Sequence, residues 1–190
     1  MIKQIFTPLT DQIINSLSVG EMVHITGEIY TARDAAHIRM VELLADGHPL
    51  PFNVNGAIVF YAGPCPAPEG VPIGSVGPTT AGRMDLHSPK LIAHGLKAMV
   101  GKGLRSKAVR EAIVAHTGIY FAGAGGVAAL MSKSVKAVEV VAFDDLGTEA
   151  IRRLTVEKFP VIVAIDSKGR CIYDRGQENA TTPPPPSSWL

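Results

Sequence analysis

Short strand-like and helix-like patterns alternate along most of this chain, and the alternation constrains the fold more than any other feature of the sequence. Residues 21–30 alternate their side chains in the way that predicts a strand, and residues 33–44 repeat apolar residues at helical spacing. Residues 57–62 form a short apolar run that predicts a second strand. Such alternation is typical of α/β domains. We therefore predict the α/β fold class.

The remaining predicted elements continue this order. A short helix begins after Thr10, whose side chain is a good N-cap, and a loop rich in Pro and Gly spans residues 63–78. Loops of that length are uncommon and are usually functional or mobile. The length of 190 residues fits one compact domain. We predict helices at residues 91–97, 106–115, 127–133 and 148–154, and strands at residues 118–121, 137–143 and 161–166, the last in a hairpin with residues 171–173.

The balance of charges limits the classes of partner. The formal net charge of +1 provides no basic field for nucleic acid. Charged residues make up 18% of the chain, below the usual ~25%, which is consistent with another chain that covers part of the surface; crystal or membrane contacts are the alternative explanations. No apolar run approaches the ~20 residues of a membrane span, and the N-terminus lacks a signal-peptide pattern. We therefore expect a cytoplasmic protein that binds neither nucleic acid nor membrane.

Two cysteines, Cys65 and Cys171, limit the metal chemistry of the chain. They are too few for a disulfide framework, for a four-cysteine zinc site or for the three thiolates that hold an iron–sulfur cluster. The six histidines show no HExxH motif or paired metal spacing, and the chain has no GxSxG or Walker A motif. We therefore predict no metal site on this chain.

Arg33 is the first candidate for a binding residue. It follows a predicted strand and opens a predicted helix, a position from which a cation reaches a ligand at the edge of a sheet. On the residues alone, the alternative is an ion pair of Arg33 and Asp34 on the surface, with His37 on a solvated face. Both interpretations are open at this point.

Two further stretches, residues 77–85 and 101–106, combine polar side chains with glycines. Thr79 or Thr80 is placed to cap a helix, and Arg83 falls on the same face, which together would form a carboxylate site. Lys102 stands between two glycines that let backbone approach a ligand closely, and Ser106 caps the next helix. The alternatives are an ordinary capped turn for the first stretch and a flexible loop for the second.

A fourth stretch, Gly123–Gly126 with Val127 and Ala128, satisfies the pattern G-x-G-x-x-A after a strand and before a helix. This pattern raises the hypothesis of a small oxidoreductase that binds NAD(P). However, Glu139 comes early for the ribose contact, and the chain is short for the two halves of a dinucleotide fold. Tight packing between strand and helix is the favoured explanation of these glycines.

The segments GEIYTARDAAHIRM, IGSVGPTTAGRMD, MVGKGLRS, VEVVAFDDLGTEAI and FPVIVAIDSKG together resemble a known family. Residues 10–174 are similar, in order and spacing, to the β subunit of class I fumarases and L-tartrate dehydratases. In one-chain members the same region is the C-terminal domain. One departure is Leu104, where a polar residue, commonly asparagine, is expected.

The resemblance implies a fold and a division of labour between subunits. Residues 1–176 are expected to form a single three-layer swivelling β/β/α domain, followed by a Pro-rich, disordered tail at residues 177–190. The chemistry implied is reversible hydration of fumarate to L-malate, or dehydration of L(+)-tartrate to oxaloacetate. A [4Fe-4S] cluster held by the α subunit acts as a Lewis acid, which agrees with the presence of only two cysteines here.

The resemblance also implies the site residues. Arg33, Arg83 and Lys102 are expected to bind the carboxylates of a C4 dicarboxylate, and Thr79 is the candidate for proton transfer or, equally, for positioning. The α subunit supplies the other acid/base groups in an αβ or α₂β₂ assembly, with contacts between β subunits as a further expectation. The choice between fumarate and tartrate is open. The rival functions are the NAD(P)-linked oxidoreductase and a non-catalytic module that retains the scaffold.

Overall fold

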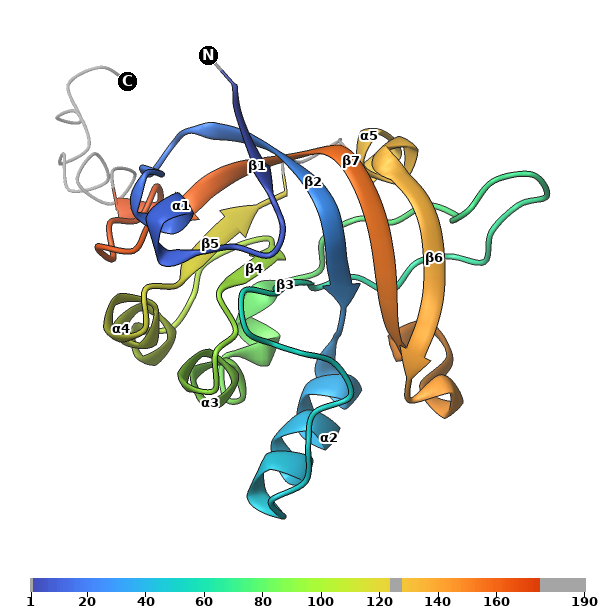
Figure 1. Cartoon of the computed structure of the whole chain (residues 1–190), viewed down its shortest axis with the longest axis horizontal. Helices are drawn as coiled ribbons and strands as arrows, with labels where there is room; N and C mark the ends of the chain where they lie inside the picture. The colour runs from blue at the N-terminus through green and yellow to red at the C-terminus, as the bar shows by residue number, and fades with distance from the viewer. Residues whose placement is uncertain (1, 124–127, 175–190) are drawn as a thin grey trace, which may run out of the picture.

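The computed structural model describes residues 2–123 and 128–174, which form a mixed α/β domain built on one seven-stranded sheet (Figure 1). The order of strands in the sheet is β1-β2-β3-β4-β5-β7-β6. The α/β class predicted from the sequence is thus confirmed. The strands are β1 (Lys3–Phe6), β2 (Met22–Thr31), β3 (Ile58–Phe60), β4 (Ala98–Gly101), β5 (Ile119–Ala122), β6 (Val135–Ala142) and β7 (Ile151–Ile165). The helices are α1 (Asp11–Asn15), α2 (Asp34–Ala45), α3 (Ser88–Ala93), α4 (Lys107–Ala115) and α5 (Ala128–Ser134), with 3-10 turns η1 (Ala81–Met84) and η2 (Asp144–Glu149).

Strand pairing runs in a closed circuit. β1 to β5 pair in parallel in chain order, and β7 returns antiparallel to β2, β5 and β6. β7 pairs with β2 along one side, while its other side pairs with β6 near its start and with β5 near its end. The strands β2, β3, β4, β5 and β7 therefore close on one another, and helices α2, α3 and α4 lie together on one side of them (Figure 1).

The apolar core has two parts, because the central strands are buried on both faces. Ile58 and Phe60 of β3 belong to one apolar cluster with the inner faces of β1, β2 and β7. Val59, between them, belongs to a second cluster, with residues of α2, α3 and α4. All three side chains are at most 1% exposed. Parallel strands that are covered on both faces form such continuous apolar runs.

Most of the predicted elements are confirmed with small shifts of their ends. The Thr10 hydroxyl accepts a hydrogen bond from Ile13 N at 3.3 Å and caps α1, and the Ser106 hydroxyl accepts one from Val109 N at 3.4 Å and caps α4. The helix predicted at residues 91–97 begins earlier, at Ser88, with a proline in its first turn. The prediction contains neither β1 nor β4, which are only four residues long.

The helix predicted at residues 148–154 is wrong. Residues from Ile151 onward are the start of β7, and the preceding residues form the 3-10 turn η2. Ile151 and Leu154 are both fully buried, and their spacing of three imitates a helix face. They belong to different apolar clusters on opposite faces of the strand, so the spacing arises from burial of both faces.

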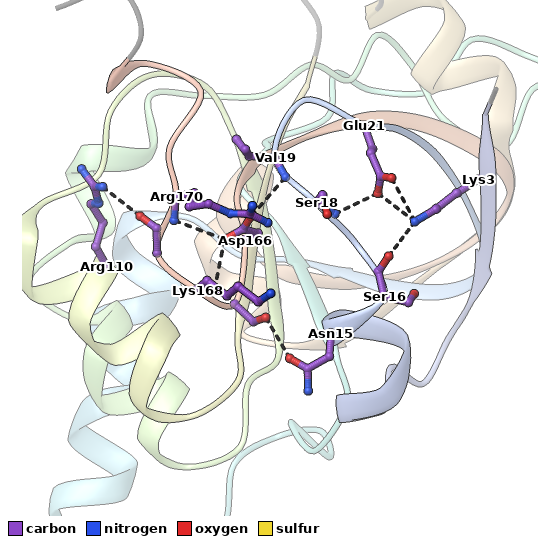
Figure 2. Close-up of polar contacts among 12 residues, drawn as sticks. Lys3, Asn15, Ser16, Ser18, Val19, Glu21, Arg110, Asp166, Lys168 and Arg170 are labelled. Atoms are coloured by element: carbon purple, nitrogen blue, oxygen red, sulfur yellow. Dashed lines mark hydrogen bonds and ion pairs between the residues drawn. The ribbon is translucent and has the colours of Figure 1, made fainter. Parts of the chain in front are cut away.

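The turn after β7 is held at the opposite edge of the sheet from the carboxyl ends of the parallel strands. Asp166 is fully buried and accepts hydrogen bonds from Val19 N at 3.2 Å, Lys168 N at 3.1 Å and Arg170 Nε at 2.7 Å (Figure 2). Burial would raise the pKa of Asp166, but Arg170 and the N–H donors outweigh burial and lower it. The predicted hairpin is thereby confirmed in part, as one bridge between Ile165 and Cys171.

Several predictions fall on other parts of the chain. The Pro-rich tail at residues 177–190 and residues 124–127 of the glycine-rich loop lie outside the described residues. Gly123 is described, and a Cβ there would lie 2.7 Å from Pro78 and 2.8 Å from Met131, so tight packing explains this glycine. Among the described residues, no helix has the length and apolar character needed to cross a membrane.

Candidate functional site

The carboxyl ends of four neighbouring parallel strands meet at one edge of the sheet. β2, β3, β4 and β5 are paired in parallel in that order. Arg33 follows β2 by two positions, and Lys102 follows β4 directly. Thr80 forms a parallel bridge with Lys102, which brings the segment that contains Thr79 and Arg83 to the same edge. The four predicted site residues therefore lie where α/β domains commonly bind ligands.

Arg33 and Arg83 converge on one carboxylate. Nε of Arg83 donates to Oδ1 of Asp34 at 2.8 Å, and Nη2 of Arg33 lies 3.7 Å from Oδ2 of the same residue. The side chain of Arg33 is 22% exposed and that of Arg83 is 50% exposed. Asp34 thus holds two cations at this edge close together, each with donors left for a further carboxylate.

Arg33 has a second counter-charge from a distant part of the chain. Its Nη2 lies 3.4 Å from Oε1 of Glu149, in η2, and the other oxygen of Glu149 accepts a hydrogen bond from Ala35 N at 2.8 Å. A Cβ at Gly63 would lie 2.9 Å from Nη1 of Arg33, so the absence of a side chain there makes room for the guanidinium. Within the described residues, the buried Nε of Arg33 has no hydrogen-bond partner.

Thr79 and Lys102 are joined through their backbones. The Lys102 N–H donates to the Thr79 carbonyl at 3.1 Å, and the Thr79 N–H donates to the Tyr61 carbonyl at 2.7 Å. The Lys102 side chain is exposed, and neither its ammonium group nor the Thr79 hydroxyl contacts a polar partner within residues 2–123 and 128–174. A fixed backbone therefore presents one cation and one hydroxyl that are both free to meet a ligand.

Two local interpretations of this edge are wrong. Neither Thr79 nor Thr80 caps an α-helix, because only the 3-10 turn η1 follows, and Thr80 makes no side-chain cap hydrogen bond. The reason is that Ala81 N–H donates to the Lys102 carbonyl at 2.8 Å, so the segment pairs with a strand end first. His37 does not lie on a solvated face: it is 0% exposed and packs edge-on against Tyr61.

Three further charged residues, Glu149, Asp85 and Arg105, lie at this edge and are not among the predicted site residues. Glu149 is a counter-charge of Arg33, and Asp85 binds Arg105 at 2.7 Å in a buried ion pair. The available signal was their position in the family segments, since Asp85 follows Arg83 by two residues and Arg105 follows Lys102 by three. Glu149 also lies in a family segment, VEVVAFDDLGTEAI, but nothing near it in the sequence indicates its contact with Arg33, because the fold brings η2 to the start of α2.

His37 gives a prediction about stability and pH. Burial lowers the pKa of His37 to about 4 from its ordinary 6.5, although the Arg33 carbonyl, which accepts the Nδ1–H at 2.9 Å, acts in the opposite direction. The ring is thus neutral in the folded protein between pH 4 and 6.5, where the unfolded chain takes up a proton. We expect the unfolding free energy to fall by about 3 kcal/mol as pH falls through this window, measured by urea unfolding of the purified protein.

The control for this prediction is a pair of variants. His37→Gln keeps an amide donor for the Arg33 carbonyl but does not titrate, so it should flatten the dependence of stability on pH between 4 and 6.5. His48→Gln, at an exposed position, should leave the wild-type dependence unchanged. An equal slope in the wild-type protein and the His37→Gln variant would contradict the assignment.

The comparisons with known proteins agree on one family. The family model described as "Fumarase C-terminus" matches residues 2–176. The chain is 40% identical over 166 residues to "Fumarate hydratase 2" of Leishmania major, an alignment that covers 86% of this chain and 29% of the relative. It is 40% identical over 164 residues to "Fumarate hydratase class I, anaerobic" of Escherichia coli K12, with 85% of this chain and 30% of the relative covered.

A shorter relative matches along nearly its whole length. The chain is 40% identical over 175 residues to a Methanocaldococcus jannaschii protein provisionally named "L(+)-tartrate dehydratase subunit beta", with 89% of this chain and 90% of that protein covered. By contrast, the chain spans only about 30% of the length of the fumarate hydratases that it matches. From the family-model match over residues 2–176 and these identities, the chain belongs to the fumarase C-terminus family.

Proposed function

We propose that this chain is the β subunit of a class I hydro-lyase that hydrates fumarate reversibly to L-malate. The observation that carries the proposal is the gathering of Arg33, Arg83, Lys102 and Thr79 at one edge of the sheet, in a chain of the fumarase C-terminus family. The alternative substrate is L(+)-tartrate, which is dehydrated to oxaloacetate. It is supported by the Methanocaldococcus jannaschii relative, whose length this chain nearly matches.

The chemistry of a C4 dicarboxylate explains why three cations are needed. Two carboxylates require fixed positive charge, and the guanidinium group of arginine can grip a carboxylate with two parallel hydrogen bonds. We propose that Arg33 and Arg83 together bind one carboxylate, since Asp34 already holds them side by side. Lys102, whose ammonium group is exposed, would bind the other carboxylate or stabilise the negative charge that builds up during proton removal.

Thr79 is proposed to stand beside the reacting carbon. The Thr79 N–H donates to the Tyr61 carbonyl, and the Thr79 carbonyl accepts from the Lys102 N–H, so the backbone that carries the hydroxyl group is fixed in place. A neutral hydroxyl is a poor base, so we propose that it orients the substrate or relays a proton to a group of the α subunit. The remaining acid/base groups would come from that subunit.

The α subunit is the proposed partner, in an αβ or α₂β₂ assembly, with contacts between β subunits as a further proposal. The chain spans about 30% of the length of the fumarate hydratases it matches, so most of such an enzyme lies outside this region. Two large apolar residues at the candidate site support a covering chain: Leu86 is 86% exposed and Leu104 is 58% exposed. They are neighbours of the joined pair Asp85 and Arg105.

The residues of this chain do not fit an iron–sulfur cluster. Of the two cysteines, Cys65 is exposed and Cys171 is buried, and they are not joined. Among the described residues, no group of three His, Cys, Asp or Glu side chains could hold a metal ion. We therefore propose that the [4Fe-4S] cluster of the enzyme is held by the α subunit and that this chain contributes the substrate-binding cations and the Thr79 hydroxyl.

The domain architecture and the cellular location of the protein are two further proposals. We propose that residues 1–176 form a single three-layer swivelling β/β/α domain. In it, helices α2–α4 and the strands β1, β2, β6 and β7 would be the outer layers. The two apolar clusters on opposite faces of β3 support this description. We further propose that the assembled enzyme works in the cytoplasm.

The proposed function is tested by assembly and assay. The chain is co-expressed with the protein encoded beside its gene, purified without oxygen, and assayed on fumarate, L-malate and L(+)-tartrate. We expect a complex that hydrates fumarate, and a higher kcat/KM for tartrate would select the alternative substrate. Activity of this chain alone, or a complex inactive on all three substrates, would overturn the proposal. Equilibrium dialysis with NAD(H) and NADP(H) tests the rival oxidoreductase, and we expect no binding.

A further inference from the structure

Behind the candidate site lies a buried cation that the proposed reaction does not use. The side chain of Arg105 is 0% exposed, and its guanidinium carbon lies 5.3 Å from the ring centre of Tyr61 and 4.9 Å from that of Tyr120. Burial alone would lower the pKa of Arg105, but Tyr61 and Asp85 outweigh it and raise that pKa above its ordinary value. Arg105 is therefore charged inside the protein, where an unpaired charge would be costly.

The contacts of Arg105 join two segments of the site. Its Nε donates to Oδ1 of Asp85 at 2.7 Å, and its Nη2 donates to the Ser88 hydroxyl at 2.9 Å. The second oxygen of Asp85 accepts a hydrogen bond from the N–H of Ser106. One carboxylate and one guanidinium thus tie the end of the η1 turn, next to Arg83, to the end of the loop that carries Lys102.

The backbone of that loop is held along its length. The Lys102 N–H and carbonyl are both bonded to the segment at residues 79–81, at 3.1 and 2.8 Å. The Gly103 carbonyl accepts a hydrogen bond from the Tyr120 hydroxyl at 3.1 Å. Gly103 has a φ of +85°, a conformation that suits glycine, so the loop turns sharply after Lys102. The exposed Lys102 side chain extends from a backbone with fixed ends.

We propose that Arg105 is a positioning residue, which holds the loop at residues 101–106 through Asp85 and so aims Lys102 at the substrate carboxylate. This inference rests on the proposed function, because it assigns the carboxylate contact to Lys102. A rigid loop lets Lys102 bind without loss of further conformational freedom, which strengthens substrate binding. Arg105 itself does not touch the substrate, since its side chain is fully buried.

The test uses Arg105→Lys in the assembled α–β enzyme. A lysine keeps the charge but cannot bridge Asp85 and Ser88 with a planar fork. We expect KM for the dicarboxylate to rise about 10-fold, with kcat within about 3-fold of the wild-type value. A merely structural role would reduce the amount of folded enzyme, which lowers apparent kcat and leaves KM unchanged, and that result would overturn the proposal. Arg110→Lys is the control and should leave KM unchanged, because the Arg110 guanidinium contacts the turn after β7 instead.

A double-mutant cycle locates the effect at Lys102. If Arg105 acts through Lys102, then Arg105→Lys should raise KM by less than about 2-fold in a Lys102→Met background. Independent, multiplying effects of the two substitutions would overturn the proposal. Tyr120→Phe, which removes only the hydrogen bond to the Gly103 carbonyl, is the milder second variant and should raise KM about 3-fold. An unchanged KM in Tyr120→Phe together with an unchanged KM in Arg105→Lys would also overturn it.

Amide hydrogen exchange separates this inference from the proposed function. In the assembled complex, Arg105→Lys should speed exchange of the Lys102 and Ser106 amides at least about 10-fold, since both donate hydrogen bonds that the clamp formed by Arg105 and Asp85 holds. This readout does not depend on the reaction. Faster exchange in the variant, in a complex that has no hydro-lyase activity, would support the role of the clamp and overturn the proposed function alone. Unchanged exchange in the variant, in a complex that is active, would overturn the proposed role of the clamp alone.

Discussion

Replacement of Arg83 by alanine is expected to lower kcat/KM for fumarate about 30-fold or more in the assembled enzyme. The loss corresponds to ~2 kcal/mol of transition-state binding, the scale of a charge-assisted hydrogen bond to a carboxylate. Arg83 is the more exposed of the two arginines on Asp34, so its removal leaves the core untouched. Steady-state assays with fumarate and L-malate measure the change.

A matched control for this variant is Arg110→Ala. Arg110 also binds one carboxylate at 2.8 Å, that of Asp174, and it lies beside the turn after β7, away from the carboxyl edge of the sheet. We expect its kcat/KM to stay within about 2-fold of wild type. Full activity of Arg83→Ala in a correctly assembled complex would exclude Arg83 from the site, whatever the control shows.

Replacement of Thr79 by valine is expected to lower kcat about 100-fold, with KM within about 3-fold of the wild-type value. Valine has nearly the same shape as threonine and carries a methyl group in place of the hydroxyl group. A group that assists proton transfer contributes to the transition state far more than to substrate binding, and its typical contribution is about 10²–10⁴-fold. The backbone bonds of Thr79 to Tyr61 and Lys102 do not involve the hydroxyl and should persist.

Thr79→Ser completes this experiment because it restores the hydroxyl group without the methyl group. We expect Thr79→Ser to recover at least about a tenth of the wild-type kcat. If valine instead raised KM and left kcat unchanged, the hydroxyl would bind the substrate equally in the ground and transition states. If both variants were fully active, Thr79 would have no role in the reaction.

Local patterns predict where the candidate residues lie in the fold, but their roles as a site are implied only by the family resemblance and stay a prediction. Arg33 stands directly between a strand pattern and a helix pattern, and parallel strands carry such junctions to one edge. Lys102 stands between glycines after an apolar run, which is again a local signal even though β4 itself was missed. What the residues could not show is which carboxylate holds which arginine. Asp34 is adjacent to Arg33 in the sequence, and yet its shorter contact is with Arg83.

The parts that could not be predicted depend on partners far away in the sequence. The start of β7 resembles a helix in the sequence because Ile151 and Leu154 are buried in different apolar clusters, and local spacing does not show that both faces of a strand are covered. The alternative with His37 on a solvated face is wrong, and nothing near His37 in the sequence indicates that Tyr61 packs against its ring. Glu149 likewise reaches Arg33 only through the fold.

The closed circuit of strands has a consequence for the synthesis of the protein. β7, the last strand among the described residues, pairs with β2, and Arg152 N donates to the hydroxyl of Thr31 across a separation of 121 residues. The circuit therefore cannot close until nearly all of the domain has left the ribosome. Until then, one edge of β2 is an unpaired template for other strands. High contact order of this kind makes folding slow. The growing chain therefore stays prone to aggregation until β7 has been synthesised and pairs with β2.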